Sequence, residues 1–227
     1  MQDGPMKEND VPYEVFLELS RSYNELEDLF MGFVRAMVNA LEAKSQWTRG
    51  HSERVTAFAQ EIAYEMNLDE TQRKAVIIAS LLHDIGKIGT LGTILEKKNS
   101  LSEDEYDILK FHPVQGAEIL RGIKQFEDVV LIIKHHHERM DGTGYPDGLK
   151  GEEIPLGARI VYVADAFDAM TEDRPYQPAI SIEESITELR RSSGTQFDPV
   201  VVDAWLRVLE MHKDWLCTFK KMTSNRQ

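Results

Sequence analysis

The sequence predicts an all-α fold, built as a helical bundle behind an N-terminal helical extension. Apolar residues recur every three or four positions through most of the chain, which is the spacing of one helix face. Capping residues such as Asp69 and Ser102 stand where these stretches begin. Pro113 falls where a helix would restart, since proline suits a first turn. Strand-like alternation is limited to a short hairpin expected near residues 149–155.

The first predicted helix starts near Phe16 and carries a heptad seam. The seam consists of Phe16, Leu19, Tyr23, Leu26, Phe30, Phe33, Met37 and Ala40. Two interpretations stay open. Such a seam is typical of a signalling or dimerising coiled coil, but bulky aromatic side chains fit a tight two-stranded seam poorly. The same spacing therefore also fits a core helix of the bundle, and Val34 and Val38 widen the stripe in its second half.

Further helices are expected in order along the chain. One follows Gly50, the next runs from the cap Asp69 to residue 84, and others open at Ser102 and at His112. The remaining ones cover residues 126–137, 158–170, 182–191 and 199–212, and the glycine-rich stretch 141–151 is expected to be a loop. We predict three parts: a helical extension over residues 1–44 with a disordered start, a catalytic domain over 45–215 and a tail over 216–227.

The composition excludes several classes of protein. The chain has 26 Lys and Arg against 39 Asp and Glu, and a net charge of -13 should repel duplex DNA and anionic membranes. The longest aliphatic run is too short to span a bilayer, and the first ten residues lack the basic and apolar regions of a secretory signal. The single cysteine, Cys217, cannot form an internal disulfide. These features predict a cytoplasmic protein without a membrane span.

Histidines and aspartates at predicted helix ends form the candidate site. His83 and Asp84 end an apolar helix, where burial of both is costly unless they are paired or bind a cation. Asp165 stands in an equally apolar run. Bundles build metal sites from ligands gathered in this way, and the candidate ligands are His51, His83, Asp84, His112, His136, His137 and Asp165. These seven exceed one coordination shell, so one aspartate is expected to bridge two ions. Imidazole and carboxylate ligands without thiolate suit iron, manganese, nickel or zinc.

Lys87 has two interpretations. It lies three residues after Asp84 and four after His83, so its ammonium faces the same cavity if the helix continues past Gly86, and it would then suit a phosphate oxygen. Alternatively, it caps the carboxyl end of the helix. Two metals can clamp the attacking and leaving oxygens of a phosphoryl displacement, so the first interpretation predicts hydrolysis of a phosphodiester by a metal-bridging hydroxide.

Several motifs resemble the HD-GYP domain, a bacterial branch of the HD phosphohydrolase superfamily. The similarity covers about residues 45 to 212 and includes the stretches 83–87 (HDIGK) and 136–146 (HHERMDGTGYP) in the order of that family. The resemblance implies a bundle of the HD-domain type. It also implies an enzyme, a phosphodiesterase that opens cyclic di-GMP to pGpG and then to GMP with two divalent ions, iron or manganese first and nickel or zinc as further options.

The resemblance also implies roles for individual residues. The seven candidate ligands match the metal-binding positions of the family, with Asp84 as the bridging, catalytic carboxylate. Lys87 would contact the scissile phosphate as a second catalytic residue, and Arg174 would help to hold the substrate. Gly144 and Tyr145 either contact substrate or only shape their loop, which in the family is linked to protein partners. Asp168 is expected to orient a ligand or to be an ordinary polar residue, whereas His135 should lie outside the cluster.

Two departures from the family pattern affect the prediction. Trp47 stands where members with a third metal carry a glutamate, so we expect two metals. Gln177 stands where a basic residue often follows, which could weaken phosphate binding. Gln177 and the heptad seam motivate an alternative, a catalytically weak receptor or adaptor that binds the cyclic dinucleotide and signals through the N-terminal helix. A homodimer through this helix is a separate expectation. Oxygen chemistry at a di-iron centre is a third possibility, against which Lys87 and Arg174 argue.

Overall fold

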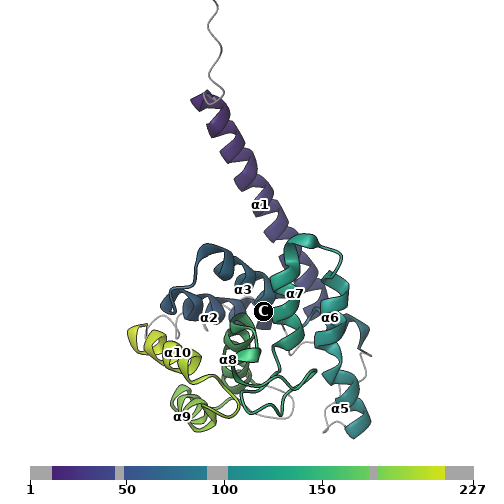
Figure 1. The fold of residues 1–227 in the computed structure, drawn as a ribbon, viewed down its shortest axis with the longest axis vertical. Helices are drawn as coiled ribbons and strands as arrows, with labels where there is room; N and C mark the ends of the chain where they lie inside the picture. Colours follow the sequence, from purple (N-terminus) through teal and green to yellow (C-terminus); the bar gives the residue numbers. More distant parts are fainter. Residues whose placement is uncertain (1–11, 44–48, 91–101, 174–177, 213–227) are drawn as a thin grey trace, which may run out of the picture. The chain divides into compact units, whose positions relative to one another are not determined.

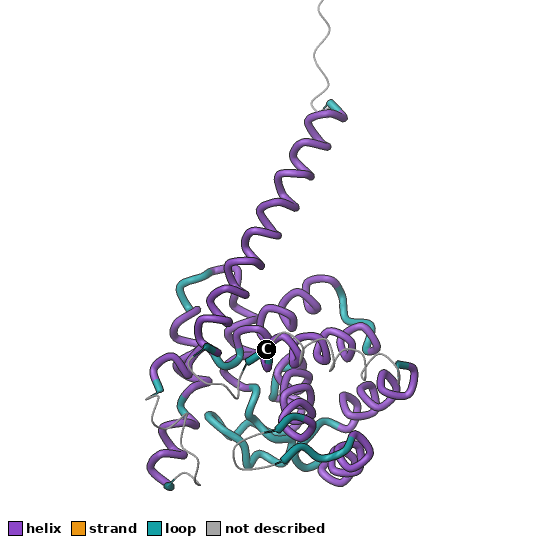
Figure 2. Tube along the Cα trace, turned by 180° about the vertical axis from the view of Figure 1, so that it is seen from behind, coloured by secondary structure: helices purple, strands orange, loops and turns teal. Residues whose placement is uncertain are grey.

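The computed structural model describes residues 12–43, 49–90, 102–173 and 178–212. The chain divides into two compact units, residues 1–37 and 38–227. Helix α1, Tyr13–Glu42, belongs to the first unit over most of its length and to the second at its end. Over the described ranges the elements are helices and loops, without a strand (Figure 2). The prediction of an all-α fold is therefore confirmed.

The second unit contains the remaining helices (Figure 1). In chain order they are α2 (His51–Glu65), α3 (Glu70–Leu82), η1 (Ile85–Gly89), α5 (Glu103–Lys110), α6 (His112–Leu120), η2 (Lys124–Phe126), α7 (Glu127–His135), η3 (Gly151–Glu153), α8 (Leu156–Thr171), α9 (Ile182–Ser192) and α10 (Pro199–Met211). The caps Asp69 and Ser102 each form a complete capping box at the start of α3 and α5, as their positions in the sequence indicated.

Helix α2 is central to the packing of this unit. It contacts α3, α8 and α10, while α3 also packs against α7 and α8. Three aromatic side chains, Phe58, Phe167 and Trp205, join α2, α8 and α10 with ring centroids 5.0 to 5.4 Å apart, and all three are fully buried. The two edge-to-face pairs, Phe58–Phe167 and Phe167–Trp205, contribute about 0.5–1.5 kcal/mol each beyond their burial. This cluster fixes α2 and α8, two of the helices that carry the candidate ligands.

The prediction of a hairpin near residues 149–155 is wrong. Residues Gly151–Glu153 form the short helix η3. The backbone N–H groups of Asp147, Gly148 and Leu149 donate to the carboxylate of Glu138 at 2.7, 3.0 and 3.1 Å. Within the predicted hairpin, Leu149 and Lys150 donate to the carboxylates of Glu138 and Glu153, and Glu153 and Ile154 donate to carbonyl oxygens three residues earlier, so these amides are not free to pair with a second strand.

Within the described ranges, no helix is long and apolar enough to cross a membrane.

Candidate metal centre

Three histidines of the second unit are oriented by backbone carbonyl groups close to them in the sequence. The Nδ1 atoms of His83, His112 and His136 each lie 2.7 Å from the carbonyl oxygen three residues earlier, which belongs to Ser80, Leu109 and Ile133 respectively. A carbonyl oxygen can only accept a hydrogen bond, so each Nδ1 carries the hydrogen. In the neutral ring Nε2 is then the atom with the free lone pair, which is the form of imidazole that binds metals.

A carboxylate from another helix orients the fourth histidine. His51, the first residue of α2, donates from Nδ1 to Asp168 of α8 at 2.7 Å. Arg54 donates to both oxygens of the same carboxylate at 2.6 and 3.1 Å. Burial opposes ionisation of Asp168, but the hydrogen bonds and charges of His51 and Arg54 lower its pKa to about 2. This is the orienting arrangement considered for Asp168, and it leaves Nε2 of His51 facing inward.

The four Nε2 atoms converge in two pairs. His51 Nε2 lies 3.3 Å from His83 Nε2, and His112 Nε2 lies 3.4 Å from His136 Nε2. When both rings of a pair are neutral and Nδ1 carries the hydrogen, two lone pairs face each other, a contact that a cation between them would relieve. Two groups of potential ligands result: His51, His83 and Asp84 form one, and His112, His136 and His137 form the other. The donor chemistry fits two divalent ions.

Asp84 stands between the two groups. Its Oδ2 lies 3.6 Å from His83 Nε2 and 3.9 Å from His51 Nε2, while its Oδ1 lies 3.4 Å from His112 Nε2. Burial opposes its ionisation, but Lys87 and the neighbouring histidines hold its pKa well below the ordinary value. The carboxylate therefore stays charged and directs one oxygen at each group, which is the arrangement that a bridging ligand needs.

The other candidate residues lie around this centre. Asp165 of α8 has Oδ1 3.4 Å from His51 Nε2. His137 is partly exposed, and its ring lies 4.0 Å from that of His136 and 5.0 Å from that of Tyr145. The structure thus places all seven candidate ligands of the sequence within one cluster.

Lys87 contacts the carboxylate of Asp84. Beyond α3 the chain continues as the tighter helix η1, and Lys87 Nζ donates to Asp84 Oδ2 at 2.6 Å. Its side chain is 23% exposed. The ammonium therefore faces the cluster, as the first interpretation of this residue predicted, and remains accessible to a ligand that enters from solvent.

The histidines of the second group are uncharged at neutral pH. Burial is the main cause: it lowers the pKa of His112 to about 3 and that of His137 to about 4, and it holds the pKa of His136 well below the ordinary value. The charges of Lys87 or of neighbouring histidines add to the effect at each of the three. His51 differs, because Asp168, Asp165 and Asp84 outweigh its burial and raise its pKa.

In the metal-free protein we expect the free energy of unfolding to fall as the pH drops from 6.5 toward 5. His112, His136 and His137 stay neutral in the folded chain, whereas in the unfolded chain they bind protons near pH 6.5. The unfolded state then holds more protons, which costs about 1.4 kcal/mol per pH unit for each such histidine. His51 acts in the opposite sense, since its raised pKa gives stability at low pH, so it offsets only one of the three.

Urea unfolding in the presence of a chelator at pH 7 and pH 5 measures this effect. Asp84 and Asp168 do not interfere, because both have lowered pKa values and lose their contribution only below the ordinary carboxyl range. Equal or greater stability at pH 5 would contradict the assignment of neutral, buried imidazoles.

The glycine-rich loop is held from inside by Glu138, which is 2% exposed. Its carboxylate accepts the three backbone donors described above. Gly144 fits against the backbone of residues 137–139, where an added Cβ would lie 2.4 to 2.6 Å from main-chain atoms. Tyr145 N–H donates to the carbonyl oxygen of His137 at 3.3 Å. The loop therefore supports His137, which favours the structural interpretation of Gly144.

The remaining candidate residues lie either outside the cluster or outside the described part of the chain. Both ring nitrogens of His135 face other groups, the Leu131 carbonyl oxygen at 2.9 Å and Asp147 at 3.0 Å, so this histidine stands apart from the cluster as expected. The structure does not describe Trp47, Arg174 or Gln177.

Sequence reasoning missed Arg54 and gave Glu138 no role. Arg54 is 7% exposed and acts through Asp168, which lies 114 residues later in the chain. Glu138 acts on backbone N–H groups nine to eleven residues away. Neither partner follows a helical or strand spacing. A buried charge within a largely apolar helix face was the one signal that could have indicated Arg54.

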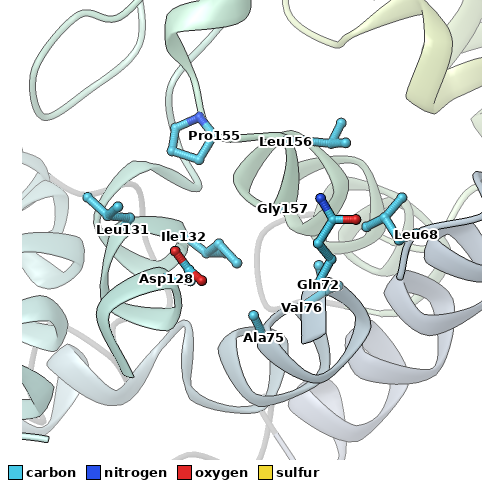
Figure 3. Close-up of a pocket in the computed structure, with 10 residues that line it drawn as sticks. All are labelled: Leu68, Gln72, Ala75, Val76, Asp128, Leu131, Ile132, Pro155, Leu156 and Gly157. Carbon is cyan, nitrogen blue, oxygen red and sulfur yellow. The ribbon is translucent and has the colours of Figure 1, made fainter. Parts of the chain in front are cut away.

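A separate groove of about 200 Å³ lies between α3, α7 and the start of α8 (Figure 3). Apolar side chains dominate its lining, with Asp128 and Gln72 as the polar members. It shares no residue with the histidine cluster, and it lacks the cations that a phosphate would need. The groove is therefore not the candidate active site.

Comparison with known proteins places this cluster in a family context. The family model of the HD domain matches residues 35–201. The chain is 41% identical over 191 residues to the cyclic di-GMP phosphodiesterase response regulator RpfG of Xanthomonas campestris, over 83% of this chain and 50% of that protein. It is 34% identical over 211 residues to the 3'3'-cGAMP-specific phosphodiesterase 3 of Vibrio cholerae, over 92% of this chain and 46% of that protein. The chain thus spans about half the length of these curated relatives.

A solved structure shows the same fold. The crystal structure of a cyclic GMP-AMP specific phosphodiesterase from V. cholerae matches with a TM-score of 0.63 at 24% identity, over 80% of this chain and 49% of that one. The predicted bundle of the HD-domain type is therefore confirmed.

Proposed function

Because this chain belongs to the HD domain family, in its HD-GYP branch, we propose that it is a metal-dependent phosphodiesterase that hydrolyses cyclic di-GMP to pGpG. Whether the end product is pGpG or GMP is a question for the product assay. One observation carries the proposal: the Nε2 atoms of four histidines meet in two pairs around a carboxylate that directs one oxygen at each pair. The names of the relatives include both cyclic di-GMP and cyclic GMP-AMP phosphodiesterases, which supports a cyclic dinucleotide as substrate.

Two divalent ions would be held by the seven ligands, with His51, His83 and Asp165 on one side of Asp84 and His112, His136 and His137 on the other. When bound, such ions lower the pKa of a water molecule and stabilise charge on phosphoryl oxygens. Iron or manganese suits the donor set best, with nickel or zinc as further options. The ions would also supply the local positive charge that a chain of net charge -13 needs to attract a phosphodiester.

The protein's own residues position and neutralise the substrate. The Nδ1 contacts fix the four imidazoles before any ligand enters, so the site needs little reorganisation. Lys87 lies on Asp84 and is partly exposed, so its ammonium can donate to a non-bridging oxygen of the scissile phosphate. Arg174 is proposed as a further contact to the nucleotide, and Tyr145, beside His137, as a contact at the rim.

The test of this proposal is anaerobic purification with metal analysis, then reconstitution with manganese or iron and chromatography of the products. Release of pGpG from cyclic di-GMP supports the proposal, and parallel assays with cyclic GMP-AMP define the preference. A metal-loaded protein that binds cyclic di-GMP tightly but never releases pGpG would instead support the receptor or adaptor function.

Lys87→Met is expected to lower kcat/KM by about 10²–10³-fold, the loss typical for removal of one group that stabilises transition-state charge. Metal content should stay the same, since an ammonium is not a ligand. Lys74→Met is the matched control, because Lys74 pairs with Glu70 on the surface of α3. Wild-type turnover in Lys87→Met would show that this residue only neutralises Asp84.

We also propose a homodimer through α1. The seam residues Phe16, Leu19, Tyr23, Leu26 and Phe33 are 58 to 67% exposed, which supports a coiled coil over a core helix. Aromatic side chains offer about 150–250 Å² each, so the exposed seam approaches the roughly 800 Å² per partner of a standard interface. The loop around Tyr145 is a second candidate surface, for a protein partner.

A further inference from the structure

A carboxylate from α1 holds the start of α2. Glu42, the last residue of α1, is 6% exposed. Its Oε2 accepts a hydrogen bond from the N–H of Gly50 at 2.6 Å, and its Oε1 accepts one from the N–H of Ser52 at 2.9 Å. His51 lies between these two residues, so Glu42 fixes the backbone on both sides of a candidate metal ligand.

Glu42 takes the place of an N-cap. The first N–H groups of a helix have no partner within the helix, and a side chain at the N-cap usually satisfies one of them. The N-cap of α2 is Gly50, which has φ 72° and no side chain to do so. A negative charge at this end also interacts favourably with the helix dipole, and hydrogen bonds to a charged acceptor are stronger than neutral ones.

The same turn of α2 leads directly to the metal centre. His51 Nδ1 is fixed by Asp168, but a hydrogen bond to the ring cannot hold the backbone that carries it. Arg54 ties the turn further, because it donates both to Asp168 and, at 3.3 Å, to the carbonyl oxygen of Arg49. Among the four histidines of the cluster with an assigned Nδ1 contact, His51 alone depends on two other elements, α8 for its ring and α1 for its backbone.

We propose that Glu42 is a positioning residue of the metal centre, through which the end of α1 sets the place of His51. The inference rests on the proposed metal site and adds a route for regulation, since α1 is one uninterrupted helix that ends in Glu42. A rotation or axial shift of the last turn of α1 would move both hydrogen bonds and withdraw His51 Nε2 from its partners.

Three variants test the proposal: Glu42→Ala, Glu42→Gln and, as a matched control on the exposed surface of α1, Glu25→Ala. The measurements are hydrogen exchange at the amides of Gly50 and Ser52 in the metal-free protein, and Mn²⁺ affinity by electron paramagnetic resonance. In Glu42→Ala we expect exchange about tenfold faster or more at these two amides and Mn²⁺ affinity reduced by about 10–100-fold. Glu42→Gln keeps one acceptor oxygen and should give an intermediate result, and Glu25→Ala should match the wild type.

The outcomes separate this inference from the proposed function. Wild-type exchange and Mn²⁺ affinity in Glu42→Ala would overturn the role of Glu42 even if the enzyme is active. A wild-type chain that binds no metal would overturn the proposed function, whereas the exchange rates of Gly50 and Ser52 would still decide whether Glu42 holds α2. Should Glu42→Ala lose its fold, Glu42→Gln decides the matter, since a variant with wild-type affinity and exchange contradicts the inference.

Discussion

Replacement of Asp84 by alanine is expected to lower turnover of cyclic di-GMP by about 10³-fold or more. Metal ions contribute several kcal/mol of charge stabilisation in the transition state, and about 1.4 kcal/mol corresponds to a tenfold change in rate. Asp84 directs one oxygen at each group of histidines. Without it both groups lose this shared ligand, so metal content should fall as well.

The fold should survive this change. Asp84 begins η1, but its side chain makes no capping hydrogen bond to the backbone there. Circular dichroism and urea unfolding of the metal-free variant would verify this, alongside metal analysis and product chromatography. Asp203→Ala, at an exposed carboxylate on α10, serves as the control and should behave as the wild type. Undiminished hydrolysis in Asp84→Ala would refute the proposed mechanism.

The largest effect on stability is expected for Gly86→Ala. An added Cβ at Gly86 would lie 2.0 Å from the carbonyl oxygen of His112 and 2.6 Å from the backbone nitrogen of Gly116. Main-chain atoms of α6 cannot rotate away as a side chain can, so η1 and α6 must separate. Overpacking typically costs about 1–3 kcal/mol and occasionally more, and we expect about 3 kcal/mol or more here.

This change should also damage the centre, because η1 follows Asp84 and α6 begins with His112. The two side chains approach to 3.4 Å, and a separation of the helices would open that distance. Urea unfolding of the metal-free protein and metal analysis measure the two effects. Gly122→Ala is the control, since its added Cβ would meet no atom within 4 Å. Equal stability of the two variants would show that α6 can move without cost.

The sequence predicted the parts of the centre that depend on local pattern. The apolar run before His83 and Asp84 indicated that both are buried at a helix end, and they are 1% and 7% exposed. The cap Ser102 and the restart at His112 placed α5 and α6 correctly. In each case the contacts that define the helix end lie within one helical turn, so the spacing of residue types is enough to predict it.

Long-range contacts to the backbone could not be predicted in the same way. The amide of Leu149, within the expected hairpin, donates instead to Glu138, eleven residues earlier, and the preceding amides of Asp147 and Gly148 donate to the same carboxylate. Glu42 looked like an ordinary residue at the end of a long helix, but its carboxylate satisfies amides eight and ten residues later. Any amide can be the partner of such a carboxylate, so no residue type or interval marks the pair in advance.

The orientation of the imidazoles has a consequence for how the centre can be tuned. The orientations of the His83, His112 and His136 rings depend only on local contacts, because each Nδ1 donates to the carbonyl oxygen three residues earlier. The orientation of the His51 ring depends instead on a residue remote in sequence, Asp168. A regulatory signal that moves helices relative to one another without unfolding them would therefore act on His51 alone among these four rings. The position of His51 would then set a graded level of the proposed activity.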